Sequence, residues 1–95
     1  MDREEKIALA HILTHPVRYR IAEKLETDKQ LFITQLAKEF GLDRKVVAFH
    51  VRILEKNKLV ATDLEMDRSP RGNPVVIRNV KLTELGRQIM SQCKL

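Results

Sequence analysis

The sequence predicts a mainly α-helical domain with a small β-sheet, that is, an α+β fold, and three observations support this prediction. Apolar residues recur at helical spacing along most of the chain, two β-prone runs follow, and the segment between those runs is dense in turn formers. Because 95 residues leave no room for a second core, the chain is expected to form a single domain over 1–95.

The first helix is expected within the segment 1–15. Asp2 suits its N-cap, and Glu5 follows three residues later as in a capping box. Its apolar residues occupy more than one side, whereas a surface helix of a monomer needs one apolar stripe. The excess predicts a partner, such as a second subunit.

A second helix, a short strand and a third helix are expected between the first helix and Gly41. Pro16 breaks the first helix and suits the first turn of the next one. The β-prone run 31–33 is expected to form a small strand. Thr34 is then expected to cap a helix over 34–40, which ends at Gly41, because a left-handed residue commonly terminates a helix.

Asp43 is expected to cap a helix over 43–57. Val47, Val51 and Leu54 fall on one side of it and should be buried. The opposite side and its flank carry the residues expected to face outward, namely Arg44, Lys45, Ala48, Phe49, Arg52 and Lys56. Two helices joined by a glycine turn form a helix-turn-helix, and here the second helix carries a basic stripe.

A β-hairpin is expected directly after the helix-turn-helix. Its strands are 58–66 and 75–82, and they flank the turn-rich segment 67–74. This segment holds Arg68 and Arg71, so the hairpin has a basic tip. A hairpin in this position is a wing.

The order of these elements is that of a winged helix-turn-helix, and the residues resemble the ArsR-like branch of bacterial and archaeal transcription regulators. The likeness is carried by "HPVRYRIAEKL", "ITQLAKEFGL", "VVAFHVRILEKNKLV" and "KLTELGRQI", which together cover most of the chain. The resemblance implies that the helix 43–57 enters the major groove of double-stranded DNA, that the wing 67–74 contacts the backbone or minor groove, and that the terminal helices form a homodimer.

The sequence departs from that family in two places. Members that sense metals often carry a pair of cysteines in the helix equivalent to 34–40, and "TQLAKEF" has no thiol. At Ala48 and Phe49, many relatives have a Ser and a His or another polar residue. Either apolar side chain could contact a thymine methyl group, or Phe49 could fold towards Val46 and Ile53 and pack on the scaffold. The sequence leaves both readings open.

The residues expected to bind DNA come mainly from the basic helix and the wing. They are Arg18, Thr34, Gln35, Arg44, Lys45, Ala48, Phe49, Arg52, Lys56, Arg68 and Arg71. Arg and Lys side chains bind phosphates and guanine edges. Thr34 and Gln35 could bind a phosphate through backbone N–H groups at a helix N-terminus, and Arg18 matches a position where relatives keep an Arg near the backbone.

The dimer interface is expected to combine both terminal helices, the second of which is capped by Thr83 and extends to Leu95. Their apolar residues exceed the needs of so small a core. The interface residues expected are Ile7, Leu9, Ile12, Leu13, Leu85, Ile89, Met90 and Cys93.

Charge and composition narrow the function. The net charge is +5, and residues 31–58 carry six basic and three acidic side chains, which makes a polyanion a reasonable partner. No catalytic Ser/His/Asp arrangement, phosphate-binding glycine loop or pair of carboxylates occurs in a suitable context, so an enzyme is not expected. Nor is a cofactor expected.

Metal binding and membrane insertion are not expected either. His11 and His15 have a spacing that can bind zinc when both lie on one helix, and Cys93 could be a third ligand. Pro16 is expected to place His15 at the start of the next helix, so the two histidines would not share a helix. The lone Cys93 fits a cytoplasmic location, and no apolar run is long enough to cross a membrane.

The sequence therefore predicts a homodimeric, sequence-specific DNA-binding transcription regulator. A repressor role is preferred, but the sequence does not decide between repressor and activator, and it identifies no effector. Two alternatives remain open. A winged helix can serve as a protein-interaction module, although such modules usually lose the basic stripe. A third possibility is a protein that coats DNA without sequence specificity.

Overall fold

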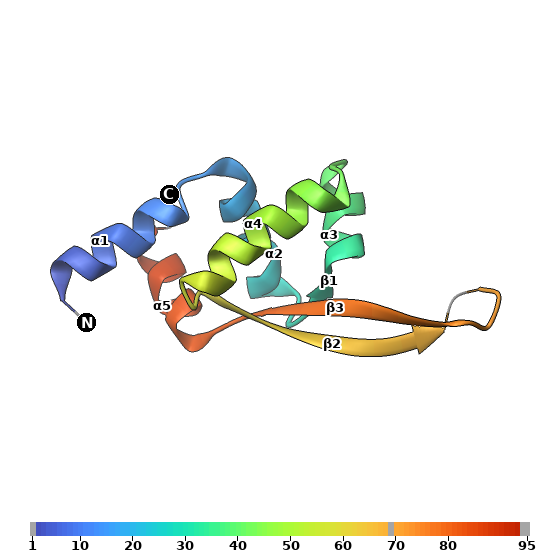
Figure 1. Cartoon of the computed structure of the whole chain (residues 1–95). Coiled ribbons are helices and arrows are strands. Elements are labelled where there is room, and N and C mark those ends of the chain that lie inside the picture. The colour runs from blue at the N-terminus through green and yellow to red at the C-terminus, as the bar shows by residue number, and fades with distance from the viewer. Residues whose placement is uncertain (1, 69, 94–95) are drawn as a thin grey trace.

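The computed structural model describes residues 2–68 and 70–93 of the chain (Figure 1). Its elements, in chain order, are α1 (Arg3–Ile12), α2 (Pro16–Thr27), β1 (Leu31–Phe32), α3 (Ile33–Phe40), α4 (Arg44–Lys56), β2 (Val60–Arg68), β3 (Pro74–Leu82) and α5 (Glu84–Cys93). This order confirms the predicted winged helix-turn-helix fold of the α+β class. The prediction that the last helix extends through Lys94 and Leu95 lies outside the described residues, as does Ser69 of the wing.

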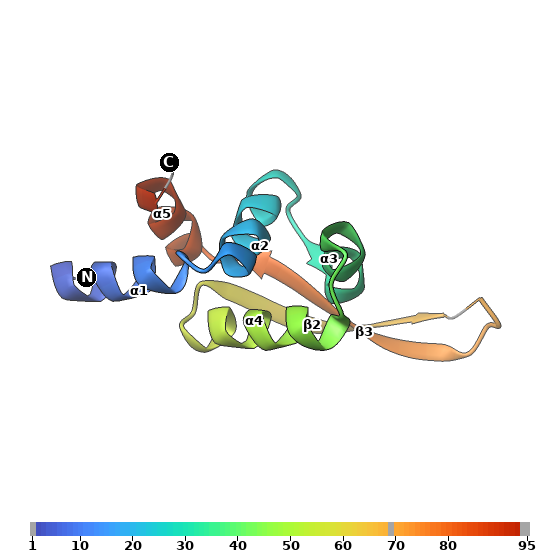
Figure 2. The same ribbon diagram turned by 90° about the horizontal axis from the view of Figure 1, so that it is seen from above.

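The molecule is elongated because two elements project from its body. Figures 1 and 2 show α1 extending from one end and the β2–β3 hairpin from the other, with the remaining helices packed between them. The principal extents are 50 × 24 × 21 Å. Within the described part of the chain, no helix is both long and apolar enough to span a membrane.

The sheet is antiparallel, with strand order β1-β3-β2. β2 and β3 pair along their whole length, from Val60 opposite Leu82 to Arg68 opposite Pro74. β1 pairs only with the inner half of β3, where Leu31 lies opposite Val80. The outer half of the hairpin is therefore a two-stranded ribbon that leaves the body of the protein.

The core lies between α2, α3, α4, α5 and the inner half of the sheet. Val47, Val51 and Leu54 of α4 are each at most 2% exposed, which confirms the predicted buried stripe. They pack with Ile21 and Leu25 of α2, both fully buried. Burial of this stripe fixes the rotation of α4 about its own axis, and therefore which of its side chains face solvent.

The ends of several helices are stabilised as predicted. The Asp2 carboxylate accepts a hydrogen bond from the Glu5 N–H at 2.7 Å, and that of Asp43 accepts one from the Lys45 N–H at 2.8 Å. Gly41 has φ = 65°, the left-handed conformation predicted for the end of α3.

The predicted cap of α3 was wrong. Phe32, not Thr34, is the N-cap residue, and α3 already begins at Ile33. The Gln35 Oε1 accepts a hydrogen bond from the Phe32 N–H at 2.8 Å, so a glutamine in the first turn satisfies the backbone here. The Gln35 side chain, and not the Thr34 hydroxyl, therefore forms the hydrogen bond at the start of α3.

The prediction for α5 was correct at its start. Thr83 Oγ1 accepts a hydrogen bond from the Gly86 N–H at 2.9 Å. Gly86 is buried against the backbone of Leu59, where a Cβ atom would lie 2.1 Å from the Leu59 carbonyl oxygen. Glycine at this position lets α5 approach the start of the hairpin closely.

Candidate nucleic-acid interface

The outward face of α4 carries the predicted basic stripe. Lys45, Phe49, Arg52 and Lys56 all lie on the exposed side, opposite the buried stripe. Arg44 is also exposed, at the N-terminal end of the helix. A helix that displays Lys and Arg on one face and is anchored by the other can be inserted into the major groove of DNA without disturbing the core.

Phe49 lies on the surface of α4 rather than in the scaffold. Its side chain is 58% exposed, and its ring meets the neighbouring ring of His50 edge-on, with 5.2 Å between ring centroids. Val46, to one side of it, is 42% exposed. Of the two readings of Phe49, the structure therefore contradicts the one in which the ring is packed away.

A groove of about 690 Å³ separates α4 from the wing. Its walls include Thr34 from the first turn of α3, Arg44, Lys45 and Ala48 from α4, and Arg78 from β3. Three of the residues that line the groove are cationic and one, Asp43, is acidic. The groove therefore brings together residues that the sequence predicted on separate elements.

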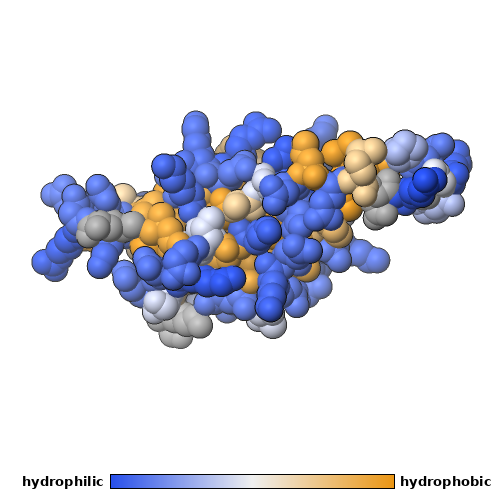
Figure 3. Space-filling model, turned by 90° about the horizontal axis from the view of Figure 1, so that it is seen from below, coloured by the Kyte–Doolittle hydropathy of each residue, from blue (hydrophilic) through white to orange (hydrophobic). Residues whose placement is uncertain are grey.

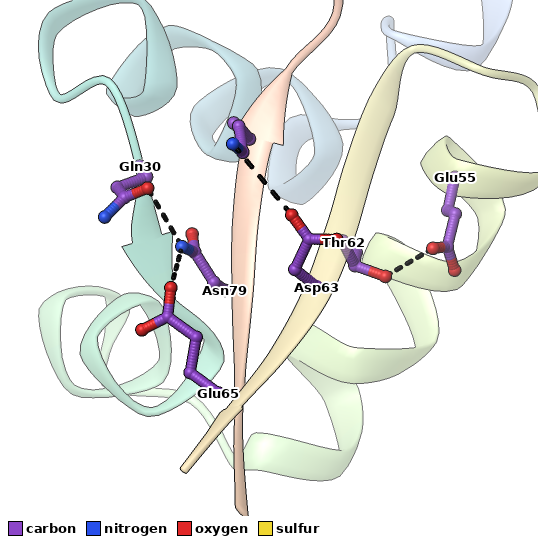
Figure 4. Close-up of polar contacts among 7 residues, drawn as sticks. Gln30, Glu55, Thr62, Asp63, Glu65 and Asn79 are labelled. Carbon is purple, nitrogen blue, oxygen red and sulfur yellow. Dashed lines mark hydrogen bonds and ion pairs between the residues drawn. The ribbon is translucent and has the colours of Figure 1, made fainter. Parts of the chain in front are cut away.

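Arg78 was missed by the sequence analysis, which treated its segment as a strand and nothing more. It is exposed and donates a hydrogen bond from Nη1 to Thr62 Oγ1 at 3.0 Å. The Thr62 hydroxyl in turn donates to the Glu55 carboxylate of α4 (Figure 4). The sequence could have indicated this position, because side chains alternate along a strand and Arg78 therefore lies on the same side of β3 as Val76 and Val80.

A second polar cluster anchors the base of the wing (Figure 4). Asn79 is 1% exposed, and its Nδ2 donates to Gln30 Oε1 at 2.9 Å and to Glu65 Oε1 at 2.8 Å. Close by, the Lys81 ammonium lies 3.9 Å from the Asp63 carboxylate. The contact with Gln30 connects the hairpin to the loop before β1, and the other two link β2 to β3 at the base of the wing.

The tip of the wing carries the two arginines predicted there. Arg68 and Arg71 are both exposed at the far end of the hairpin. The Arg68 Nη1 lies 3.4 Å from the Gly72 carbonyl oxygen, across the turn. Gly72 has φ = 84°, a conformation that favours glycine and that closes the turn.

Arg18 proves to be part of the scaffold. Its Nε donates to the Ile12 carbonyl oxygen at 2.7 Å, and its Nη1 lies 3.5 Å from Nδ1 of His50. The guanidinium therefore joins the end of α1 to α4. The expected contact between Arg18 and phosphate is not supported by this geometry, because the side chain is half-buried and already hydrogen-bonded inside the fold.

His50 belongs to the same buried cluster. Its ring centroid lies 4.4 Å from that of His15, whose Nδ1 accepts a hydrogen bond from the Val17 N–H at 3.2 Å. Burial lowers the pKa of His50, and the electrostatic effect of the neighbouring His15 and Arg18 side chains lowers it further. The sequence placed His50 at the edge of the buried stripe, but only the structure shows that it contacts the turn between α1 and α2.

The dimer residues predicted from the sequence divide into two groups. Leu13, Ile89 and Met90 are each at most 1% exposed and belong to the core of the monomer, so their prediction as surplus interface residues was wrong. The others remain accessible on the terminal helices, with Ile7 61% exposed. The half-buried members of this group are Leu9, Ile12, Leu85 and Cys93.

Within the described residues, no group of three or more His, Cys, Asp or Glu side chains has a geometry that could hold a metal ion. His15 caps α2 and stacks on His50, as described above. Burial raises the pKa of the Cys93 thiol, which favours its neutral form.

Comparison with known proteins agrees with this geometry. Residues 13–63, more than half of the chain, match the family described as "Helix-turn-helix domain". Among solved structures, the chain is similar to the transcriptional regulator homologue protein from Pyrococcus horikoshii OT3, with a TM-score of 0.71 and 26% sequence identity over 95% of this chain and 86% of that chain. No curated protein matches the sequence significantly. The family match covers α2, α3 and α4, and the chain therefore belongs to the helix-turn-helix domain family.

Proposed function

We propose that this protein is a sequence-specific DNA-binding transcription regulator that acts as a homodimer, within the ArsR-like branch of winged helix-turn-helix proteins. The observation that carries this proposal is the outward face of α4, which presents Lys45 and Arg52 from a helix locked in place by its buried side. The family match and the similarity to a transcriptional regulator homologue support the same function.

In this proposal α4 lies in the major groove and reads base edges. Arg and Lys side chains donate to guanine O6 and N7, and a small residue such as Ala48 allows close approach of the helix to the bases. The exposed ring of Phe49 suits an apolar contact with a thymine methyl group. Thr34 and Gln35 are both exposed in the first turn of α3, and Thr34 lines the groove; their backbone N–H groups are proposed to bind a phosphate.

The wing is proposed to contact the DNA backbone or minor groove through Arg68 and Arg71, since its tip is far from the α4 surface. The homodimer is proposed to form through α1 and α5, where Ile7 is exposed and Leu9 and Leu85 are half-buried. A two-fold dimer would present two copies of α4 to an inverted repeat about one DNA turn apart, roughly 34 Å. A repressor role is proposed from the resemblance alone.

A second candidate function is a protein-interaction module. It is favoured by the apolar character of the exposed surface, because six of the seven large hydrophobic side chains exposed in the described part of the chain lie on α4 or the hairpin. These six are Val46, Phe49, Leu64, Met66, Val75 and Val76. The cationic residues beside them favour DNA over an average protein surface.

One experiment distinguishes these functions. Genomic DNA fragments that bind the purified protein would be selected and sequenced, and the affinity for a selected site would be compared with that for random DNA of equal length at one salt concentration. A sequence-specific regulator should favour the selected site by about 10³-fold or more. Equal affinities would instead indicate a DNA-coating protein, and the absence of DNA binding would favour the interaction module.

A further inference from the structure

The two faces of the wing hairpin differ in chemical character. Strand pairing places Leu64 opposite Arg78 and Met66 opposite Val76, so these four side chains share one face of the ribbon. This face, which we call the inner face, continues inward into the buried side of the sheet and forms a wall of the groove beside α4. It combines apolar side chains with a cation.

The apolar residues of the inner face are not covered by the body of the protein. Leu64 is 62% exposed, Met66 69% and Val76 61%. Figure 3 shows hydrophobic side chains gathered along the stem of the hairpin, beside a hydrophilic tip. They stabilise no core in this structure and are available to contact a partner.

The opposite, outer face carries carboxylates. Asp63 pairs with Lys81 there, and Glu65 accepts a hydrogen bond from Asn79. By contrast, the alternating residues of β2 and β3 that make up the inner face include no Asp or Glu. A polyanion would be repelled by the outer face and not by the inner one.

The charges around the inner face identify the partner. Arg78 lies beside Leu64 at its base, and Arg44 and Lys45 stand across the groove from it. The carboxylates of Asp43 and Glu55 also lie here, so cations outnumber carboxylates by three to two. A partner that suits both the cations and the apolar strip has regularly spaced negative charges separated by apolar groups. The sugar–phosphate backbone of DNA, with its deoxyribose rings and base edges between phosphates, has this pattern.

We infer that Leu64, Met66 and Val76 form an apolar contact surface for double-stranded DNA, against which deoxyribose and base edges pack while the flanking cations bind phosphates. This inference rests on the proposed DNA-binding function and goes beyond it, since it assigns the inner face of the wing, and not only its arginine tip, to the complex. It also sets the orientation of the wing, with the carboxylate-bearing face turned away from the DNA.

The inference predicts a contribution to affinity that does not depend on salt. Contacts between cations and phosphates release counterions, so they determine the slope of log affinity against log salt concentration. Burial of apolar surface releases none, so its loss should lower the affinity equally at every salt concentration.

The test compares Met66→Thr/Val76→Thr with Val75→Thr. Threonine keeps a β-branched or β-compatible side chain at these exposed strand positions. Val75 is 37% exposed on the outer face, so it provides a matched control within the same hairpin. Affinity for a selected DNA site would be measured at several salt concentrations, with circular dichroism to verify that each variant is folded.

We expect the double variant to bind about tenfold more weakly at each salt concentration with an unchanged slope, and the control to match the parent protein. Unchanged affinity of the folded double variant would overturn the inference while leaving the proposed function intact. A change in the sedimentation of the free protein, with no loss of DNA affinity per dimer, would assign the strip to a second copy of the chain and would also overturn it. A parent protein that binds no selected DNA would overturn the proposed function itself.

Discussion

The two projections of this molecule, α1 and the wing, differ in the charges that surround their exposed apolar residues. Both leave the body of the protein, at opposite ends (Figure 1), and both carry apolar side chains that the monomer does not bury. α1, a helix described in full, has no buried residue, and Ile7 is exposed at its middle. On the wing, the corresponding exposed apolar residues are Leu64, Met66 and Val76.

The charges differ in a way that points to different partners. α1 carries two basic and two acidic side chains, Arg3, Glu4, Glu5 and Lys6, so it is close to neutral. The inner face of the wing combines its apolar residues with arginine and with no carboxylate in its β2 and β3 positions. Mixed charges suit a copy of the same chain, whereas an excess of cations suits a polyanion. Charge pattern, more than apolar area, distinguishes the two surfaces.

The largest expected effect comes from breaking the α1 surface. Ile7→Glu would place an unpartnered charge in the proposed interface, so the dimer should dissociate. Each monomer would then hold one half-site, and specific affinity should fall by about 10³-fold or more. Sedimentation velocity at micromolar concentration measures the change. Lys29→Glu, an exposed site outside both projections, is the control, and an Ile7→Glu protein that still sediments as a dimer would contradict the α1 interface.

The second-largest expected effect tests whether α4, which lies between the two projections, contacts base edges. Arg52→Ala and Lys45→Ala should each weaken binding to a selected site by about 1–3 kcal/mol if the lost contact is bidentate. Lys38→Ala removes an exposed cation from α3, outside the α4 face, and should have little effect. Titration of labelled DNA would measure all three affinities. Parent-like binding by both α4 variants would exclude this face as the reading surface.

A smaller effect separates the tip of the wing from its inner face. Replacing Arg68 and Arg71 together by Ala should reduce the slope of log affinity against log salt by up to about two phosphate contacts. Lys81→Ala, whose ammonium pairs with Asp63 on the outer face, should leave the slope close to that of the parent. If the double variant kept the parent slope, the tip would not touch DNA.

The smallest effect concerns the junction that holds α1 and α4 together. Because burial lowers the pKa of His50 from 6.5, the unfolded chain binds more protons than the folded one as the pH falls through 6.5 towards the lowered value. The free energy of unfolding should therefore decrease on acidification through this window and be unaffected by His50 above it. His50→Gln should make that dependence shallower in urea unfolding at several pH values. Equal pH dependence in parent and variant would show that His50 does not couple protonation to folding.

Local patterns were sufficient to predict most of the fold. The spacing of Val47, Val51 and Leu54 predicted the buried stripe of α4, and Gly41 and Asp43 marked the turn of the helix-turn-helix, because helix periodicity and end-capping depend on near neighbours in the chain. The exposed positions of Lys45 and Arg52 followed from the same periodicity. The prediction that Thr34 caps α3 was wrong, because the Gln35 side chain accepts a hydrogen bond from the Phe32 N–H instead.

What the sequence by itself determined is thus the order of the elements, the turn chemistry and the basic stripe. Tertiary packing decided the rest. It placed Leu13 and Ile89 in the monomer core, engaged Arg18 with the backbone of Ile12, and brought Arg78 to the groove beside α4. Each outcome depends on contacts between segments distant in the chain, and no periodicity within one segment reports which neighbour will cover it.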